Sequence, residues 1–380
     1  MTNVMTLGEV ATYINGRAFK PSEWEETGLP IIRIQNLTES NKKYNYSSKT
    51  FDEKFRIKND DLLFAWSASL GAFIWKGGDA WLNQHIFKVE PKPFIQKRYL
   101  YYFLLYVIAA LYAKTHGSGM VHITKRPFMS TPIQVPSRPE QKRIVEKIDE
   151  LFSGLDAAES ELRVAKEKLE KYRTIIIDSI FSKCTTRKLN TLCDVITDGD
   201  HQPPPKSESG VPFIMISNIE GNVINWENTA FVDLKYYQGI GEKRTPKKGD
   251  ILYTVTGSFG IPVSVDFERK FCFQRHIALL RPIKSVQHKF LFYALQTSGV
   301  FTQAVEQSTG TAQKTVGLGV LRNFNVPFTE SQKDQESIIN EIDFFLNGHR
   351  KIEQTIERAL RQCCNLRHSV LTQAFEGDLA

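Results

Sequence analysis

The chain has 380 residues, of which 41% are hydrophobic and 24% charged, and it carries a formal net charge of +7. No apolar stretch reaches the roughly 18 residues of a membrane span, and the five cysteines lack CxxC spacing, so they indicate neither a zinc site nor a disulfide framework. No signal peptide is visible before the first element, and these features predict a cytoplasmic protein of about two domains.

The first 137 residues predict an α+β module in which strands dominate. Runs rich in β-branched and aromatic residues, bounded by Gly, Pro and Asn, predict short strands near residues 30–37 and 61–68. The period becomes helical over residues 99–112, and a loop of small residues follows at 116–119. We therefore expect a globular domain over residues 1–137.

A long helix is predicted over residues 138–183. Apolar residues recur there at alternating steps of four and three, which is the heptad pattern of a coiled coil. At 1.5 Å per residue, such a helix is a rod of roughly 50–60 Å. The predicted seam residues are Ile144, Ile148, Leu151, Leu155, Leu162, Leu169 and Ile176.

The rest of the chain repeats this organisation. Residues 192–219, 250–260 and 334–343 match residues 7–37, 61–71 and 140–149 in the same order. We therefore expect a second mainly-strand domain over residues 184–329, followed by a second long helix over residues 330–380. The predicted seam of that helix consists of Ile338, Ile342, Phe345, Ile352, Ile356, Leu366 and Val370.

Two helices of this kind in one chain most simply pair with each other, antiparallel, because each must bury its seam. The alternative is a surface helix packed on its own domain, but a small domain offers no partner surface of that length. The predicted fold class is therefore α+β, with two similar mainly-strand domains separated by two long antiparallel coiled-coil helices in a pseudo-twofold repeat. Such a molecule suits a ligand with two sites at a fixed separation. His349 on the seam is interpreted as a tolerated polar residue, with a pH switch as the alternative.

The positive charge is concentrated on the two globular parts. Residues 1–137 carry 17 Lys and Arg against 11 Asp and Glu, and residues 184–329 carry 16 against 12. Residues 138–183 are balanced at 10 against 10, and residues 330–380 carry 6 against 9. A basic surface is the electrostatic footprint of a polyanion binder. Because the excess is doubled in register with the repeat, it favours DNA or RNA as the ligand.

Candidate DNA-binding residues are those that read bases or contact phosphates and that fall in loops or at strand ends. Positions shared by both copies suit structural or phosphate-contacting roles, whereas positions that differ, such as Arg33 against Met215 or Trp66 against Val255, suit sequence reading. The alternative for Asn36 and Asn218 is a strand-terminal turn, and for His85 and His276 a structural histidine. The candidates are Arg17, Lys20, Arg33, Gln35, Asn36, Ser67, Ser69, Gln84 and His85 in the first copy, and His201, Gln202, Lys206, Ser217, Asn218, Thr256, Ser258, Arg275 and His276 in the second.

Over essentially the whole chain, these features resemble the specificity subunit of type I restriction–modification systems. The resemblance rests on the repeat, the TDGDHQPPP stretch at 197–205, the strand-like GDILYTVTGSFG at 249–260, and the QH and RH segments at His85 and His276. The two EQ- or DQ-led heptad helices and the closing LRHSVLTQAFEGDL also look like that family. The first copy reads YINGRAFKPSEW where the second has the TDGDH form, which fits two domains that read different sequences.

The resemblance implies a division of labour. Each globular domain would be a target recognition domain that reads one half of an asymmetric, bipartite site in double-stranded DNA. The helices would set the spacer length and dock two methyltransferase subunits, which use S-adenosylmethionine to methylate adenine N6, and a restriction translocase subunit can join them. This chain would then be a non-catalytic subunit with no cofactor or metal of its own. In keeping with that, the sequence has no Walker A pattern, no strand-linked GxGxxG and no amino-methyltransferase motif.

Two other classes of function stay open. One is a self-sufficient nuclease or methyltransferase with degenerate motifs, and the other is a structural adaptor whose basic modules hold protein partners. The ExK spacing of Glu90 and Lys92, with Asp79 upstream, is interpreted as accidental because the second copy lacks both the acid and the lysine. Asp198, Asp200 and His201 are interpreted as part of a Pro-rich turn, with a divalent metal site as the alternative.

Overall fold

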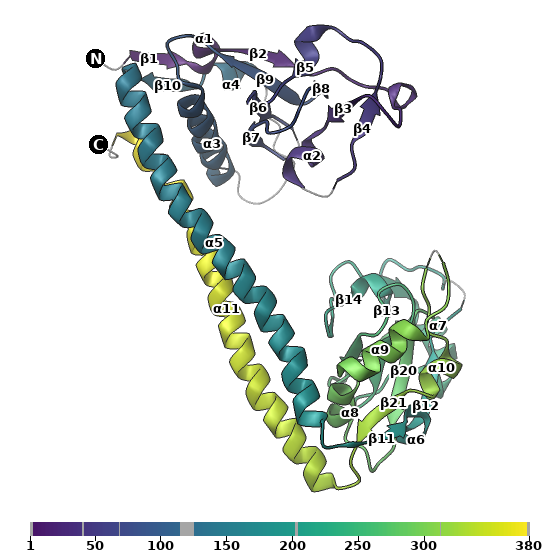
Figure 1. Ribbon diagram of the computed structural model, residues 1–380. Helices are drawn as coiled ribbons and strands as arrows, with labels where there is room; N and C mark the ends of the chain where they lie inside the picture. The colour runs from purple at the N-terminus through teal and green to yellow at the C-terminus, as the bar shows by residue number, and fades with distance from the viewer. Residues whose placement is uncertain are drawn as a thin grey trace. The chain divides into compact units, whose positions relative to one another are not determined.

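The computed structural model (Figure 1) describes residues 3–39, 42–67, 69–114, 125–201, 204–311 and 313–377, without the side chains of residues 109–114 and 125. The predicted loop at 116–119 lies outside this range. Two compact units are present: unit 1 comprises Met1–Arg163 with Glu357–Ala380, and unit 2 comprises Val164–Ile356. Each unit therefore contains one globular part and a segment of both long helices. Each long helix is divided between the two units and does not form a unit by itself.

Unit 1 contains two four-stranded sheets, ordered β2-β9-β6-β7 and β4-β3-β8-β5, and a two-stranded sheet of β1 and β10. Its strands are β1 (Asn3–Thr6), β2 (Ala11–Asn15), β3 (Leu29–Ile32), β4 (Asn45–Ser47), β5 (Arg56–Ile57), β6 (Leu62–Ala65), β7 (Gly71–Ile74), β8 (Ala80–Leu82), β9 (Ile86–Pro91) and β10 (Pro132–Val135). Its short helices are α1 (Leu7–Val10), α2 (Ile34–Thr38), α3 (Lys97–Lys114) and α4 (Lys125–Met129). The helix α3 packs against β6 and β7, where the helical period predicted it.

Unit 2 repeats this arrangement. Its sheets are ordered β12-β20-β17-β18 and β16-β13-β19, with β11 paired to β21 and β14 to β15. The strands are β11 (Thr185–Lys188), β12 (Cys193–Asp198), β13 (Val211–Ile214), β14 (Ile219–Glu220), β15 (Val223–Ile224), β16 (Ala230–Val232), β17 (Ile251–Thr254), β18 (Pro262–Ser264), β19 (Cys272–Phe273), β20 (Ile277–Pro282) and β21 (Asn325–Phe328). The short helices are α6 (Leu189–Leu192), α7 (Leu234–Gly239), α8 (His288–Ala294), α9 (Ser298–Glu306) and α10 (Leu318–Arg322).

The predicted internal repeat is confirmed by this topology. The order β2-β9-β6-β7 recurs as β12-β20-β17-β18, and β4-β3-β8 recurs as β16-β13-β19. The parallel pair β3–β8 has its counterpart in the parallel pair β13–β19. The central strands β6 and β17 are buried on both faces, since alternate side chains enter different core clusters. Phe64 and Leu63 do so in unit 1, and Tyr253 and Leu252 in unit 2.

Two details of the predicted repeat are wrong. The strands expected over 30–37 and 212–219 end at Ile32 and Ile214, and a helical turn follows each. The turns form because Asn36 and Asn218 use their side-chain oxygens to accept a hydrogen bond from the backbone three residues earlier. The sequence match also paired residue 7 with residue 192. Because α1 begins at Leu7 and α6 at Leu189, the structural match is three residues earlier.

The long helices are α5 (Arg138–Phe181) and α11 (Gln332–Glu376), close to the predicted bounds. In unit 1, Arg367 near the end of α11 donates to Asp156 in the first half of α5. In unit 2, His349 in the first half of α11 donates to the carbonyl oxygen of Leu169 in the second half of α5. Both contacts require the two helices to run antiparallel, as predicted. Within the described residues, no helix combines the length and apolar content needed to cross a membrane.

All seven predicted seam residues of α5 are buried or partly buried. The same holds for five of the seven in α11, but the side chains of Ile352 and Leu366 are 53% and 52% exposed. A straight α-helix drifts relative to a strict heptad, so the buried stripe moves off the predicted positions. Ile339 and Leu371, which lie outside the predicted seam, are buried.

Each globular part is anchored to the long helices in the same way. Gln141 and Gln335 are fully buried, and their side-chain oxygens accept a hydrogen bond from the backbone N–H of Gln96 (2.7 Å) and Gln287 (2.9 Å), respectively. About two helical turns further on, Asp149 and Asp343 accept hydrogen bonds from the hydroxyl groups of tyrosines on α3 and α8. These four side chains belong to the EQ- and DQ-led segments of the repeat. Buried, fully hydrogen-bonded polar groups of this kind fix one geometry.

Candidate nucleic-acid interface

The turn before β9 and the turn before β20 are equivalent. In unit 1 the backbone N–H of Gln84 donates to the carbonyl oxygen of Arg17 at 2.9 Å, and in unit 2 that of Arg275 donates to Asp200 at 3.1 Å. The glycine before each acceptor permits this close approach. A Cβ at Gly16 would lie 2.1 Å from the carbonyl oxygen of Asn83, and one at Gly199 would lie 2.0 Å from that of Phe273. The sheets therefore present one exposed side chain at the same place in both units.

The histidine that follows this side chain packs inward. His85 adopts a left-handed backbone conformation (φ 72°), and its ring lies 4.9 Å from the ring of Trp66. Trp66 in turn donates from its indole nitrogen to Asn15 at 3.2 Å. In unit 2, burial and the neighbouring Arg275 lower the pKa of His276, which favours the uncharged imidazole. The ring contact with Trp66 favours the structural interpretation of His85.

Unit 2 has an open pocket of about 370 Å³ beside this turn. Apolar and aromatic side chains line it together with a few cationic ones, which suits a planar base attached to a phosphate backbone. Four of the predicted DNA-binding residues meet here: His201, Lys206, Arg275 and His276. The other lining residues are Asp200, Pro204, Phe213, Met215, Ala230, Phe231 and Gln274.

The equivalent place in unit 1 is filled by aromatic rings in edge-to-face contact. The ring of Phe51 lies 5.1 Å from that of Phe19 and 5.2 Å from that of Trp81, which occupies the place of Cys272 in unit 2. The guanidinium of Arg17 lies 4.3 Å above Phe51 and donates two hydrogen bonds to Glu23 at 2.9 and 2.6 Å. These hydrogen bonds lower the pKa of Glu23 to about 2. Arg17 is thus engaged within the protein.

The remaining predicted residues are not gathered into either place. Asn36 and Asn218 are used as caps, which favours the turn interpretation, and Ser67 and Thr256 are largely buried. The guanidinium of Arg33 lies 5.8 Å from the ring of Trp24. Ser69, Ser217 and Ser258 are exposed, Lys20 precedes a short 3-10 helix, and Gln35 lies in α2. Gln202 lies outside the described residues.

Sequence reasoning missed the walls of the pocket in unit 2. Phe213 lies on β13 and Phe231 on β16, and these strands pair antiparallel. Phe213 lies beside Cys272 of β19, whereas Phe231 lies opposite Pro212, so the two rings leave the sheet on opposite faces. The sequence analysis named neither residue, because the lining of the pocket depends on this strand pairing.

The acids near the pocket already have partners, which favours the turn interpretation over a metal site. The imidazole of His201 lies 2.8 Å from a carboxylate oxygen of Asp198. Asp200 accepts a hydrogen bond from the hydroxyl of Tyr236, and the guanidinium of Arg244 lies within 3.9 Å of both acids. These contacts tie the loop to α7 and to the turn after it.

The ExK residues of unit 1 point to different partners. Asp79 pairs with Arg56 at 2.5 Å, Glu90 pairs with Lys88 at 3.5 Å, and Lys92 donates to the hydroxyl of Thr12 at 3.4 Å. A metal-dependent nuclease needs such groups to converge on one ion. Their separate partners favour the interpretation that the spacing is accidental.

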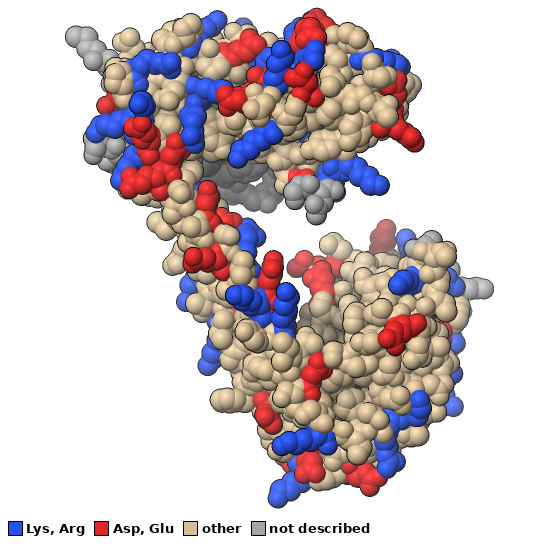
Figure 2. Space-filling model, in the orientation of Figure 1, with Lys and Arg blue, Asp and Glu red and all other residues tan. Residues whose placement is uncertain are grey.

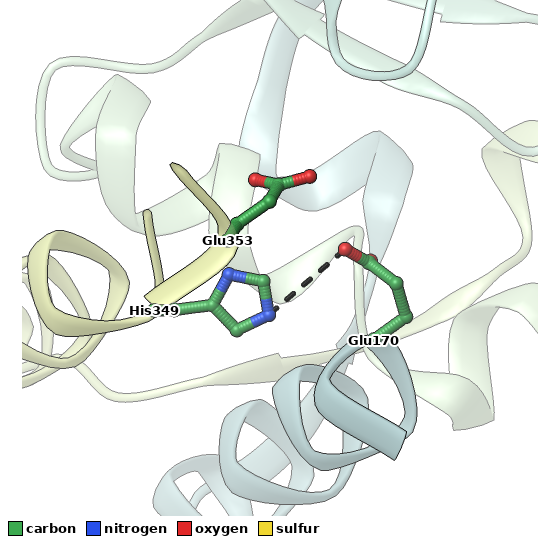
Figure 3. Close-up of side chains that lie close together, drawn as sticks. All are labelled: Glu170, His349 and Glu353. Carbon is green, nitrogen blue, oxygen red and sulfur yellow. Dashed lines mark ion pairs between the residues drawn. The ribbon is translucent and has the colours of Figure 1, made fainter. Parts of the chain in front are cut away.

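A group of possible metal ligands occurs in unit 2, where Glu170 of α5 faces His349 and Glu353 of α11 (Figure 3). Their ligand atoms lie within 4.8 Å of one another. The ring nitrogen Nε2 of His349, which faces Glu170 at 4.0 Å, is 3.1 Å from the carbonyl oxygen of Leu169. A carbonyl oxygen can only accept, so Nε2 carries a proton, and Nδ1 is then the ring nitrogen whose lone pair a metal could use. Through its Nε2 proton the histidine provides a hydrogen bond between the helices.

Charges of both signs are interspersed on the visible face of each unit (Figure 2). The cationic excess of the globular parts is therefore not a single uniform patch on that face. Many arginines are engaged in ion pairs, as Arg17, Arg56, Arg281 and Arg367 illustrate. A cationic side chain is available to a ligand here only where no acidic side chain of the protein already neutralises it.

Comparisons with known proteins agree with the fold. A family model described as "Type I restriction modification DNA specificity domain" matches residues 2–165 and 182–362. The type I restriction enzyme EcoBI specificity subunit of Escherichia coli is 26% identical over 412 residues, covering 99% of this chain and 85% of that protein. The MjaVIII specificity subunit of Methanocaldococcus jannaschii is 24% identical, covering 96% of this chain and 91% of that protein. A chain in a solved structure of a type I R-M system superposes with a TM-score of 0.70 at 18% identity, covering 100% of this chain and 98% of that one.

Proposed function

The chain belongs to the type I restriction–modification DNA specificity family, and we propose that it is the subunit that selects the DNA sequence on which such a system acts. Each globular part reads one half of an asymmetric, bipartite site in double-stranded DNA. The chain selects the DNA sequence, and the partner subunits catalyse the reaction on the DNA.

One observation carries this proposal. The same turn, held by the same backbone hydrogen bond beside the same glycine, presents Gln84 in one unit and Arg275 in the other. A duplicated catalytic module would keep its functional side chain in both copies. A duplicated reader changes it, because glutamine and arginine prefer different base edges in the major groove.

The long helices have a second role in the proposal. They hold the two readers at a set separation and dock two methyltransferase subunits, which use S-adenosylmethionine to methylate adenine N6. Apolar side chains on both helices support such docking, since Tyr172, Ile175 and Phe344 are 58%, 58% and 84% exposed. Large exposed apolar residues on one surface are typical of protein interfaces. A restriction translocase subunit joins this complex in the same proposal.

The test is a map of N6-methyladenine across the source genome, by single-molecule sequencing, with and without this gene. The proposal expects a split motif of two short half-sites around a fixed gap, which disappears when the gene is deleted. Unchanged methylation, together with DNA binding that ignores sequence in the purified complex, contradicts the proposal and favours a structural adaptor. Methylation or cleavage of DNA by the purified chain alone would instead establish an enzyme.

A further inference from the structure

The two equivalent turns differ from the rest of the surface in one respect: their side chains are uncommitted. Gln84 and Arg275 are exposed, and within the described residues neither side chain makes a hydrogen bond, an ion pair or a ring contact. Their backbone N–H groups, by contrast, are both used to hold the turn. The backbone of each residue is therefore held in place, while the functional group of its side chain remains unpaired.

The contrast is sharpest for arginine. The other five arginines of residues 184–329 all have a partner inside the protein, through a hydrogen bond, an ion pair or a ring: Arg187, Arg244, Arg269, Arg281 and Arg322. Among the described arginines of this globular part, Arg275 alone has none. A guanidinium presents its donors in a fixed fork, and leaving that fork unpaired at the rim of a pocket gains nothing for folding.

The surroundings explain why a free guanidinium is kept there. The lining of the pocket beside Arg275 includes Phe213, which is buried, Phe231, which is partly exposed, and a second cation, Lys206. Burial and the charge of Arg275 lower the pKa of the neighbouring His276, which favours its uncharged form. A cationic fork next to an apolar recess suits a base edge whose phosphate lies at the rim.

We infer that Arg275 and Gln84 are the base-reading residues at equivalent positions of the two half-sites, with Arg275 reading a guanine and Gln84 an adenine. The inference rests on the proposed function and assigns one base position in each half-site. Arginine pairs with the O6 and N7 atoms of guanine through two hydrogen bonds, and glutamine pairs with the N6 and N7 atoms of adenine in the same way. The turn supplies the positioning, and the side chain supplies the identity of the base.

The experiment uses the full-length chain in complex with its methyltransferase subunits and a library of DNA duplexes with randomised half-sites. Bound DNA is sequenced for the wild-type complex and for Arg275→Gln and Gln84→Arg. With Arg275→Gln, preference for guanine at one position of one half-site should fall by roughly 5- to 150-fold and shift toward adenine, while the other half-site is unchanged. Gln84→Arg should produce the reverse change at one position of the other half-site. Unchanged preferences at the other positions of the affected half-site show that the mutated unit is folded.

Arg269→Gln is the matched control. It removes the same charge from the same unit, but this guanidinium lies 4.1 Å above the ring of Trp226 and is already engaged. The control should leave every base preference intact. If Arg275→Gln also leaves them intact, or weakens binding to all sequences equally, Arg275 contacts phosphate and the inference is wrong while the proposed function stands. If the wild-type complex itself selects no sequence, the proposed function fails and the inference falls with it.

Discussion

Unit 1 and unit 2 have the same sheet order, yet the place beside their equivalent turns is filled in one and open in the other. In unit 1, Phe51 packs between Phe19 and Trp81 and carries Arg17 on its face. In unit 2 the place of Trp81 is taken by Cys272, and a pocket of about 370 Å³ remains. The fold thus fixes where a side chain is presented, whereas a few substitutions around it decide what surface the DNA meets.

The difference extends to an ion pair at the other end of the same strands, away from the turns. In unit 2, Arg281 donates two hydrogen bonds of 2.8 Å to Asp250, whose side chain is 2% exposed. At the same place in unit 1, Asp61 is 26% exposed and lies 3.7 Å from the ammonium group of Lys88. The first is a buried, bidentate ion pair and the second a loose one. The two units therefore respond differently to the same change.

Asp250→Ala has the largest expected effect. It leaves the Arg281 guanidinium and the backbone N–H of Lys247 without their acceptor in a place that water hardly reaches. Removing one member of a buried ion pair destabilises a protein by about 3–5 kcal/mol. Urea unfolding of the full chain, with hydrogen exchange on β20 as a local probe, measures this loss.

Asp61→Ala is the matched change in unit 1. Its carboxylate accepts one backbone hydrogen bond, from Lys58 at 2.8 Å, in addition to the loose pair. The free energy of unfolding is expected to fall by about 1 kcal/mol. Hydrogen exchange on β9 measures this loss locally. Equal losses from the two variants would show that the difference in burial has no energetic consequence.

The sequence predicts the features that depend on periodicity. The heptads of α5 and α11 and the two copies of the strand pattern identify the fold, and the QH and RH segments mark the turns at Gln84 and Arg275. The filled and open places could not be predicted, because Phe51 and Phe231 reach them from segments far along the chain. Arg17 shows the same limit: the sequence identifies a basic loop residue, but only the fold shows that Glu23 neutralises it.

Phe51→Ala tests whether the edge-to-face contacts of Phe51 stabilise the place in unit 1 that is open in unit 2. The variant loses two ring contacts and the support under Arg17, so the free energy of unfolding of unit 1 is expected to fall by about 1–2 kcal/mol. Phe231→Ala is the comparison in unit 2, where the ring lines an open pocket and the loss is expected to be about 1 kcal/mol or less. Denaturant unfolding of both variants decides the matter. A larger loss from Phe231→Ala would mean that the ring of Phe231 is packed more tightly than the ring of Phe51.

The smallest expected effect concerns the protonation of His276. Burial is the larger cause of its lowered pKa and the positive charge of Arg275 the smaller one. Because the folded state binds this proton less readily than the unfolded state, the stability that the neutral ring contributes is complete above a pH of about 6.5 and is lost as the pH falls toward the lowered pKa. Arg275→Gln removes only the charge, so the pKa of His276 should rise part of the way back to its ordinary value.

Titration of the imidazole signals by NMR measures this shift, and His288 provides the internal control. The pKa of His288 is also lowered by burial, but its neighbouring charges are Asp266, Lys289 and Lys248 rather than Arg275. Its pKa should therefore be the same in both proteins. If the pKa of His276 does not move, the Arg275 guanidinium points away from the imidazole and the pocket. Arg275 would then contact the phosphate backbone. The difference between Arg275 and Gln84 would change the affinity for DNA rather than the base that is selected.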